Sequence, residues 1–325
     1  MDHISIVGSV CYDVGGIISK AVGGKIFIGP EILRSPGGAL FHTARYLGSQ
    51  NLSVAVKTFV ALEKDVYGEM IKKELKEQGM DISHLKEVEM STNFSVFALD
   101  PETAERIIIV IEGAIRKYEM NFKDYYTIGK SRAVFLTHSY AEDSREQIKE
   151  IARICQKKNP IFCQMGKTQY AFGMEFLSNI AQKVTSIQFN EDEARQVLNI
   201  KNNPTGVQLA TRLVEELPGV PIINLTFGNG GSITYDRRTD SFHTSGIHVV
   251  DSVNSVGAGD IFFASFNLEF LLSGGDTQKA LLTARASAAQ KTTGEILKRD
   301  EVAGFQKKYP ALPIVVQAAS RKAAA

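Results

Sequence analysis

The stretch Asn254-Ser255-Val256-Gly257-Ala258-Gly259-Asp260 leads directly into an apolar run that begins at Ile261. Two glycines around one small residue allow the backbone to turn tightly and to point its N–H groups outward. Residues 258–273 read as a buried helix, so these N–H groups would lie at a helix N-terminus, where the helix dipole favours negative charge. The stretch therefore predicts an anion-binding turn with Asp260 at its rim. A glycine turn with Asp260 as a helix cap explains the same residues equally well.

Short apolar strands alternate with helices through most of the chain. Strands are expected at 4–7, 53–61, 133–136, 161–163, 186–189 and 222–225, and helices at 39–47, from 65 onward, and at 142–157, 170–182, 191–198, 205–216, 258–273 and 277–292. Alternation of this kind predicts a mostly parallel sheet with helices on both faces, which is a three-layer α/β/α core.

Two segments of β character, 14–36 and 92–112, interrupt this alternation. We expect them to pair with each other as a small β-sheet lid. In open α/β sheets, ligands bind at the carboxyl ends of the strands, so a lid there would close over a site. The predicted organisation is then an α/β core, a lid and a C-terminal tail, formed by residues 1–13, 37–91 and 113–310, by residues 14–36 and 92–112, and by residues 311–325, respectively.

The composition is that of a soluble globular protein. Among 325 residues, 37 Lys and Arg balance 36 Asp and Glu, which excludes a strongly basic nucleic-acid-binding protein. The N-terminus has no signal-peptide pattern, and the apolar stretch 261–272 is too short to span a membrane, so we expect a cytoplasmic protein. Cys11, Cys155 and Cys163 fit neither a metal motif nor a disulfide framework, and reduced thiols are expected.

A glycine-rich segment, Thr226-Phe227-Gly228-Asn229-Gly230-Gly231, follows the strand expected at 222–225. Glycine lets a backbone approach a phosphate or a flat base closely, and Thr226 can donate a hydrogen bond. The segment is not a dinucleotide-binding fingerprint, because β-like residues 232–235 follow it where the fingerprint opens a helix. This argues against a dinucleotide-dependent oxidoreductase. A hairpin turn explains the segment about as well as a binding loop does.

Oxygen-bearing side chains follow the strand expected at 186–189. Asn190 and Glu193 would lie at the carboxyl end of that strand, where such groups can organise magnesium and its waters. The same spacing is also that of a capping box at the start of a helix. Both interpretations stay open.

The N-terminal region carries candidate polyol ligands. Asp13 can accept two hydrogen bonds, and the pair Gly37-Gly38 would let a small ligand approach the backbone. His42 would either contact a sugar hydroxyl or pack within its helix, and its position after the glycine pair favours contact. Cys11 is expected to be a packed thiol near this pocket and not a nucleophile, since no base stands near it in the sequence.

Taken together, these segments resemble the ribokinase-like (PfkB) carbohydrate kinase family, from the first strand to about residue 294. The family's glycine pair before a helix corresponds to Gly37-Gly38, and its Asp-x-x-Gly to residues 65–68. Its Asn-x-x-Glu, Thr-x-Gly-x-x-Gly and Gly-Ala-Gly-Asp patterns match, in order, Asn190 with Glu193, Thr226 with Gly228 and Gly231, and residues 257–260.

The resemblance implies an ATP- and Mg²⁺-dependent kinase that moves the γ-phosphoryl group to a primary hydroxyl of a small, furanose-like sugar. Asp260 would be the base. The resemblance assigns the anion hole to Gly257, Ala258 and Gly259, the nucleotide to Thr226, Gly228 and Gly231, magnesium to Asn190 and Glu193 through water, and the sugar to Asp13, Gly37, Gly38 and His42. Phosphoryl transfer depends mainly on positioning and charge neutralisation, which suits this set of groups.

Departures from the family pattern concern mainly the acceptor side. His42 replaces an Asn, Glu63 a Gly, and Gln164-Met165-Gly166 an Asp-x-Asn-like segment. Asn254 replaces an Asp that often helps to hold a monovalent cation, which puts potassium activation in doubt. The phosphate-side motifs are intact, so we expect a working phosphotransferase with an atypical acceptor.

Two alternatives remain, a nucleoside kinase of the same fold and a non-catalytic, kinase-like regulatory protein. We expect a small-molecule partner, no nucleic acid and no membrane. The lid strands are expected to pair across a two-fold axis, which would hide their edges in a homodimer.

Overall fold

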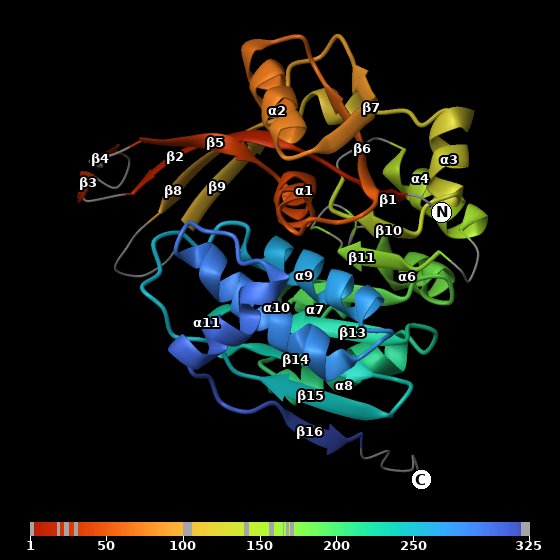
Figure 1. The fold of residues 1–325 in the computed structure, drawn as a ribbon, viewed down its shortest axis with the longest axis vertical. Helices are drawn as coiled ribbons and strands as arrows, with labels where there is room; N and C mark the ends of the chain where they lie inside the picture. The colour runs from red at the N-terminus through yellow and green to blue at the C-terminus, as the bar shows by residue number, and fades with distance from the viewer. Residues whose placement is uncertain are drawn as a thin grey trace.

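A ten-stranded sheet forms the centre of the computed structural model, which describes residues 3–17, 20–22, 26–28, 32–99, 106–139, 143–155, 159–164, 166, 169 and 172–319 (Figure 1). Seven strands are mutually parallel and lie in the order β7 (Met80–Glu87), β6 (Ala55–Leu62), β1 (His3–Val7), β10 (Ala133–Leu136), β11 (Ile161–Gln164), β12 (Ser186–Asn190) and β13 (Ile222–Thr226). The sheet continues with antiparallel β14 (Ser232–Asp236), β15 (Ser241–Ser245) and β16 (Val315–Ala318).

Helices cover both faces of this sheet. The helices are α1 (Ala39–Ser49), α2 (Val66–Glu77), α3 (Phe122–Gly129), α4 (Ser144–Ile154), α6 (Gly173–Ala181), α7 (Glu191–Val197), α8 (Gly206–Glu216), α9 (Ala258–Leu272), α10 (Thr277–Thr292) and α11 (Val302–Lys308). α1, α9 and α10 pack together on one face. The helices between β10 and β13 connect strands in the opposite direction and so, by the right-handed crossover rule, lie on the other face. The predicted three-layer core is confirmed.

Coverage on both faces explains the composition of the central strands. All four residues of β10, Ala133-Val134-Phe135-Leu136, are buried, because neither face of the strand meets water. Nearly all of α9 is buried as well, including Phe263 and Phe266, since other elements surround it. An apolar helix of this kind belongs to the core of the protein. No helix among the described residues combines the length and the apolar character that crossing a bilayer requires.

A separate four-stranded sheet, which we call the small sheet, stands off from the main sheet at the upper left of Figure 1. Its order is β5 (Ile32–Gly37), β2 (Cys11–Ile17), β8 (Phe94–Leu99) and β9 (Arg106–Ile111), with β2 and β8 parallel and the other pairs antiparallel. β3 (Lys20–Val22) and β4 (Ile26–Ile28) form a hairpin beside it. The predicted small sheet is thus confirmed, with β2 starting at Cys11 and β5 ending at Gly37.

The C-terminal segment differs from the expected tail. Residues 315–318 form β16, which pairs with β15 at the edge of the main sheet, where Phe242 lies opposite Gln317. All four residues of β16 are exposed, so the strand has no buried apolar face that a sequence pattern would reveal. Its position follows from the backbone groups of β15, an edge strand that would otherwise lack partners.

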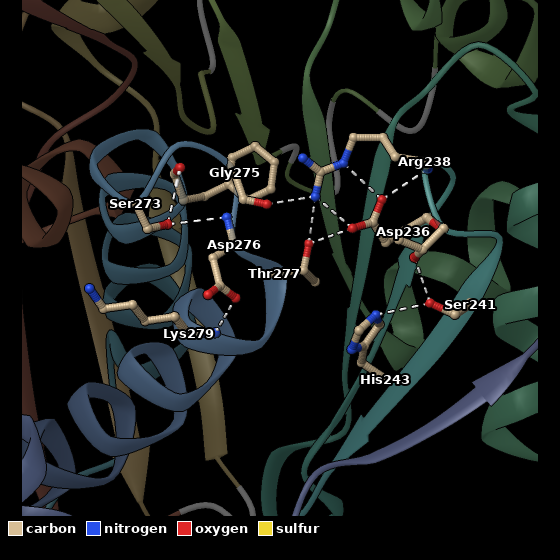
Figure 2. Close-up of polar contacts among 11 residues, drawn as sticks. Asp236, Arg238, Ser241, His243, Ser273, Gly275, Asp276, Thr277 and Lys279 are labelled. Carbon is tan, nitrogen blue, oxygen red and sulfur yellow. Dashed lines mark hydrogen bonds and ion pairs between the residues drawn. The ribbon is translucent and has the colours of Figure 1, made fainter.

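A polar network fixes the far ends of α9 and α10 (Figure 2). Asp236 accepts hydrogen bonds from Arg238 Nη2 and Thr277 Oγ1, each at 2.6 Å, and Arg238 Nη2 also donates to the Gly275 carbonyl at 2.7 Å. The network therefore joins the β14–β15 hairpin to the turn between α9 and α10. Asp236 lies opposite Ile222, at the amino end of β13, so the carboxyl-end edge of the sheet and the start of α9 lie at the other end of these elements.

Candidate active site

The turn at residues 257–260 opens α9 and requires glycine at its first position. Gly257 has a φ of 81°, in the left-handed region that favours glycine. A β-carbon there would also lie 2.7 Å from Cδ2 of His42. Gly259 is exposed, and Gly257, Ala258 and Asp260 are half-buried, so the turn reaches the surface. The Ala258 N–H donates to the Ser255 carbonyl at 3.1 Å. The other N–H groups at the start of the helix, together with the helix dipole, make the turn suited to bind an anion.

Side-chain amides at the carboxyl ends of β11 and β12 hold the first turn of α9. Gln164 Nε2 donates to Asp260 Oδ1 at 2.7 Å, and Gln188 Nε2 donates to the Gly259 carbonyl at 2.9 Å. Sequence reasoning noted Gln164 only as a departure from the family pattern and did not single out Gln188. The two glutamines could have been recognised in the sequence by their position, because each lies near the carboxyl end of a parallel strand, where ligands bind in such sheets.

Asp13, on β2, is enclosed by the small sheet. Its Oδ1 accepts hydrogen bonds from Ser95 Oγ at 2.5 Å and from Cys11 Sγ at 3.0 Å. Burial raises the pKa of Asp13, and these two hydrogen bonds partly oppose that effect. Gly37 makes room for the carboxylate, since a β-carbon at that position would lie 1.9 Å from Asp13 Oδ2. Ser95 lies opposite Asp13 in register and was not predicted from the sequence.

The thiol of Cys11 donates a hydrogen bond to Asp13 and lies within electrostatic range of Asp260. Burial raises the pKa of Cys11 well above its usual range, and the negative charges of Asp13 and Asp260 raise it further. The thiol is therefore neutral, which excludes the thiolate nucleophile. The structure brings the N-terminal candidate Asp13 and the turn at Asp260 into one region, because α1 contacts both: its N-cap Gly38 lies against the Cys11 backbone, and its His42 lies against Gly257.

The neighbouring glycine Gly38 and His42 both pack closely against other segments at the start of α1. Gly38 has a φ of 89°, and a β-carbon there would lie 2.9 Å from the Ser9 carbonyl oxygen. The imidazole of His42 is buried beneath Gly257, and its two nitrogens have no hydrogen-bond partner among the described residues. Burial lowers its pKa to about 3. This neutral, enclosed ring favours the packing interpretation over the expected sugar contact.

A cavity of about 500 Å³ lies between the β13–β14 connection and the helices α9 and α10. It brings together five predicted residues, namely Thr226, Gly228, Gly231, Ala258 and Gly259. The φ angles of Gly228 and Gly231, 55° and 85°, shape its wall. The cavity also has apolar lining that sequence reasoning missed, from the segment 246–250 and from Phe262. These residues follow no motif, because any apolar side chain can cover a flat ligand.

Asn190 and Glu193 form the capping box at the start of α7. Asn190 Oδ1 accepts from the Glu193 N–H at 2.9 Å, and Glu193 Oε2 accepts from the Asn190 N–H at 2.7 Å. Direct coordination of a metal by these two oxygens would compete with the cap. Among the described residues, no three His, Cys, Asp or Glu side chains gather as a metal site. The donors therefore fit a hydrated Mg²⁺, which usually keeps several waters and takes phosphate oxygens as ligands.

Asn190 and Thr226 lie next to each other at the carboxyl ends of β12 and β13, where they are partners in the parallel register. Thr226 Oγ1 donates to the Phe189 carbonyl at 3.4 Å and lies on the wall of the cavity. The two motifs that follow these strands are therefore neighbours in space. Thr226 lines the cavity, whereas Asn190 and Glu193 lie beside it and are not part of its lining.

Comparisons with known proteins agree with this architecture. Residues 1–296 match the model of the pfkB family carbohydrate kinases. A ribokinase from Arabidopsis thaliana, solved with ribose and ATP, is 20% identical with a TM-score of 0.77, over 94% of this chain and 99% of that chain. A ribokinase from Giardia lamblia is 19% identical with a TM-score of 0.78, over 95% and 100%. A Burkholderia thailandensis nucleoside kinase in complex with inosine is 17% identical with a TM-score of 0.74, over 95% and 99%.

No curated protein matches the sequence. The solved structures, at 20% identity or less, share the fold and include enzymes named for two acceptor classes. The family model, by contrast, matches nearly the whole chain, including the glycine pair at 37–38 and the turn at 257–260. The family resemblance seen in the sequence is thus confirmed, and the chain belongs to the pfkB family of carbohydrate kinases.

Proposed function

We propose that this protein transfers the γ-phosphoryl group of ATP to a primary hydroxyl of a small, furanose-like sugar. One observation carries the proposal. The turn at 257–260 lines the cavity through Ala258 and Gly259, and it lies on His42 of α1, whose N-cap Gly38 lies against the backbone of Cys11, two residues before Asp13. A nucleotide in the cavity and an acceptor at Asp13 would therefore meet at this turn.

Each residue of the candidate site has a separate role in the proposed phosphoryl transfer. Asp260 accepts the proton of the acceptor hydroxyl, whose oxygen bonds to the γ-phosphorus as the bond from phosphorus to the β–γ bridging oxygen breaks and ADP leaves. The N–H groups of Gly257 and Gly259 stabilise the charge on the moving phosphoryl group. The Ala258 N–H would join them only by giving up its hydrogen bond to the Ser255 carbonyl. Gln164 orients the base through its 2.7 Å hydrogen bond. Magnesium, when bound, would neutralise phosphate charge, and Asn190 and Glu193 would hold it through water.

The acceptor is bound by Asp13, Gly37 and Gly38. The carboxylate of Asp13 is buried in the small sheet and can accept hydrogen bonds from vicinal hydroxyls, and Gly37 leaves it room. The small sheet would act as the lid, since β2 and β8 carry Asp13 and Ser95 on the same face. Closure would exclude water and so suppress hydrolysis of ATP. His42 would contribute by supporting the turn from below.

We also propose that the outer face of the small sheet mediates a homodimer. Ile32 of β5, Val96 of β8 and Ile109 of β9 are 63%, 40% and 58% exposed, and β5 and β9 are edge strands. Exposed apolar edges favour pairing with another chain. Sedimentation velocity at micromolar concentration would show a dimer, and a monomer for Ile109→Lys. A monomeric wild-type protein would reject this assembly.

An ADP-release assay with a panel of pentoses, hexoses and nucleosides tests the reaction. We expect turnover with a sugar, and a loss of about 10²- to 10⁴-fold in kcat for Asp260→Asn, because the base is removed. Asp276→Asn is the matched control, since Asp276 caps α10 and Asn caps equally well. Turnover with nucleosides alone would indicate a nucleoside kinase. No turnover with any acceptor would favour the regulatory alternative.

A further inference from the structure

Two glutamines beneath the start of α9 form a pair across neighbouring strands. Gln164 of β11 and Gln188 of β12 are partners in the parallel register, so their side chains lie on the same face of the main sheet. Gln164 Nε2 donates to Asp260 Oδ1 at 2.7 Å, and Gln188 Nε2 donates to the Gly259 carbonyl at 2.9 Å. Two strands therefore hold two consecutive residues of the turn at 257–260 through side-chain amides.

The oxygen of each amide is left unsatisfied. A carboxylate and a carbonyl can only accept, so each amide must direct its NH₂ group at α9 and its own oxygen elsewhere. The Oε1 atoms of Gln164 and Gln188 are both buried and accept no hydrogen bond within the described part of the chain. A buried acceptor without a donor costs stability, and an apolar side chain of similar shape would avoid that cost. Folding alone therefore does not explain these two amides.

A second polar contact between β12 and α9 has no such unsatisfied atom. Ser186, two residues before Gln188 and on the same face of β12, donates through Oγ to Asn267 Oδ1 at 2.6 Å. Asn267 Nδ2 donates in turn to the Phe263 carbonyl at 2.8 Å, and both polar side chains are buried. Asn267 lies about two helical turns beyond Asp260. This contact joins the same strand to the same helix, but away from the turn.

We propose that Gln164 and Gln188 are a pair of positioning residues that hold the base and the anion-binding turn in the geometry of phosphoryl transfer, at a cost in stability. This inference rests on the proposed function and adds Gln188 and the cost to it. Gln164 fixes the carboxylate of Asp260 and, as an uncharged donor, favours its ionised form. Gln188 fixes the backbone at Gly259. Because Gly259 belongs to α9, its carbonyl also accepts within the helix, so the turn stays folded without Gln188.

The first test compares Gln188→Met with Ser186→Ala by thermal unfolding and in the ADP-release assay. Gln188→Met should lower kcat roughly 10- to 100-fold with little change in the KM values, because the turn loses its fixed orientation. It should unfold at the wild-type temperature or above it, because the unsatisfied oxygen is gone. In Gln188→Met, a kcat equal to that of the wild type, or a lower melting temperature, would overturn the proposal.

Ser186→Ala is the matched control, and it should behave in the opposite way. The substitution leaves Asn267 Oδ1 without a donor inside the core, so the melting temperature should fall. The turn keeps both of its amide contacts, so kcat should stay at the wild-type value. A fall of kcat in Ser186→Ala as large as that in Gln188→Met would show that any contact between β12 and α9 has this effect, and would overturn the proposal.

Gln164 has a separate effect on the pH profile, since it contacts the carboxylate itself. Gln164→Met removes a hydrogen bond that favours the ionised form, so the acidic limb of kcat/KM should move to higher pH. Gln164→Glu places a like charge beside Asp260 and should move the limb further, by about one pH unit or more. Gln188→Met, which does not touch the carboxylate, should leave the limb in place. Acidic limbs that coincide in the wild type and in Gln164→Glu would overturn the role of Gln164.

The other titratable and charged groups around the start of α9 are the same in all these variants. They are Cys11 of β2, His42 and Arg45 of α1, and Lys291 of α10. A shift of the limb that is confined to the variants of Gln164 therefore reports on the contact of its amide with Asp260.

Titration of the Asp260 carboxyl by ¹³C NMR needs no turnover, so it separates this inference from the proposed function. The full-length protein is labelled at aspartate, and the signal is assigned from its absence in Asp260→Asn. The midpoint should rise in Gln164→Met, rise further in Gln164→Glu and stay at the wild-type value in Gln188→Met. Equal midpoints in all four proteins would overturn the role of Gln164. Absence of turnover in the wild type would instead refute the proposed function, and the titration would still decide whether Gln164 acts on Asp260.

Discussion

Gly257 lies directly on the imidazole of His42, so closely that a β-carbon at residue 257 would be 2.7 Å from His42 Cδ2. Gly257 is the N-cap of α9, and His42 belongs to α1. Their contact fixes the position of the turn relative to α1. The imidazole that supports the turn is neutral, because burial lowers the pKa of His42 to about 3. The anion-binding turn is therefore supported by a side chain 215 positions away in the sequence.

Gly257→Ala should destabilise the protein and abolish activity. The new methyl group would clash with His42, and alanine at a φ of 81° is strained, which together cost about 2–4 kcal/mol. Gly259→Ala is the matched control, because a β-carbon there meets no atom within 4 Å. Thermal unfolding should show a lower melting temperature for Gly257→Ala alone. Equal melting temperatures would show that the turn adapts without cost.

Asp13→Asn should stabilise the protein at neutral pH while it weakens acceptor binding. Burial raises the pKa of Asp13 above its ordinary value of 3.8, so the folded state binds more protons than the unfolded state as the pH rises past that value. Stability is therefore lost with rising pH, and the amide removes that loss. The amide oxygen can still accept from Cys11 and Ser95.

The measurement is the melting temperature from pH 3 to pH 8. The variant and the wild type should coincide at the acid end, and the variant should be the more stable at pH 7. In the kinase assay, its KM for the acceptor should rise. A variant less stable than the wild type at pH 7 would show that the charged form of Asp13 contributes to the fold.

Asp236 should behave in the opposite way. Its hydrogen bonds with Arg238 and Thr277 hold the pKa below 3.8 despite burial, so its contribution is present at neutral pH and is lost as the pH falls through the lowered pKa. Asp236→Asn should lower the free energy of unfolding by about 2–4 kcal/mol at pH 7, and the difference should shrink in acid. Asp276→Asn, in the same region of Figure 2, should change it little. A constant deficit from pH 7 to pH 3 would contradict this assignment.

The C-terminal strand offers a pair of truncations. A chain that ends at Pro313 loses β16, whose four residues are exposed, and should keep its melting temperature within a few degrees. A chain that ends at Tyr309 also loses the Leu312 carbonyl, which accepts from the buried Arg285 at 2.7 Å. That loss should cost about 1–3 kcal/mol more. Equal melting temperatures for the two truncations would contradict the role of this contact.

The alternation of strands and helices could be predicted because the central elements have strong patterns. The strand at 133–136 and the helix at 277–292 have the predicted bounds, since buried strands and long helices carry clear signals. β7, formed by Met80–Glu87, was missed because its apolar residues do not alternate regularly and only Met80 and His84 are buried. β16 was missed for the same reason.

The site could be predicted only where it is local. The turn at 257–260 and the segment at 226–231 can be recognised from the spacing of their glycines, because the backbone conformation there depends on a few adjacent residues. The sequence left two interpretations of His42, sugar contact and packing, and could not decide between them, since its burial depends on the approach of α9 to α1. Ser95 and Gln188 carry no motif, and only the pairing of their strands brings them to the site.

The two halves of the site come from different parts of the chain. The wall of the cavity is built from residues 226–292, whereas Asp13, Gly37 and Ser95 come from the first hundred residues and the small sheet. Under the proposed function, evolution could change the preferred alcohol in one half without changing the residues that bind the phosphate groups in the other. A chimera that exchanges only the small sheet with that of a relative should change which molecule is phosphorylated and leave the donor unchanged.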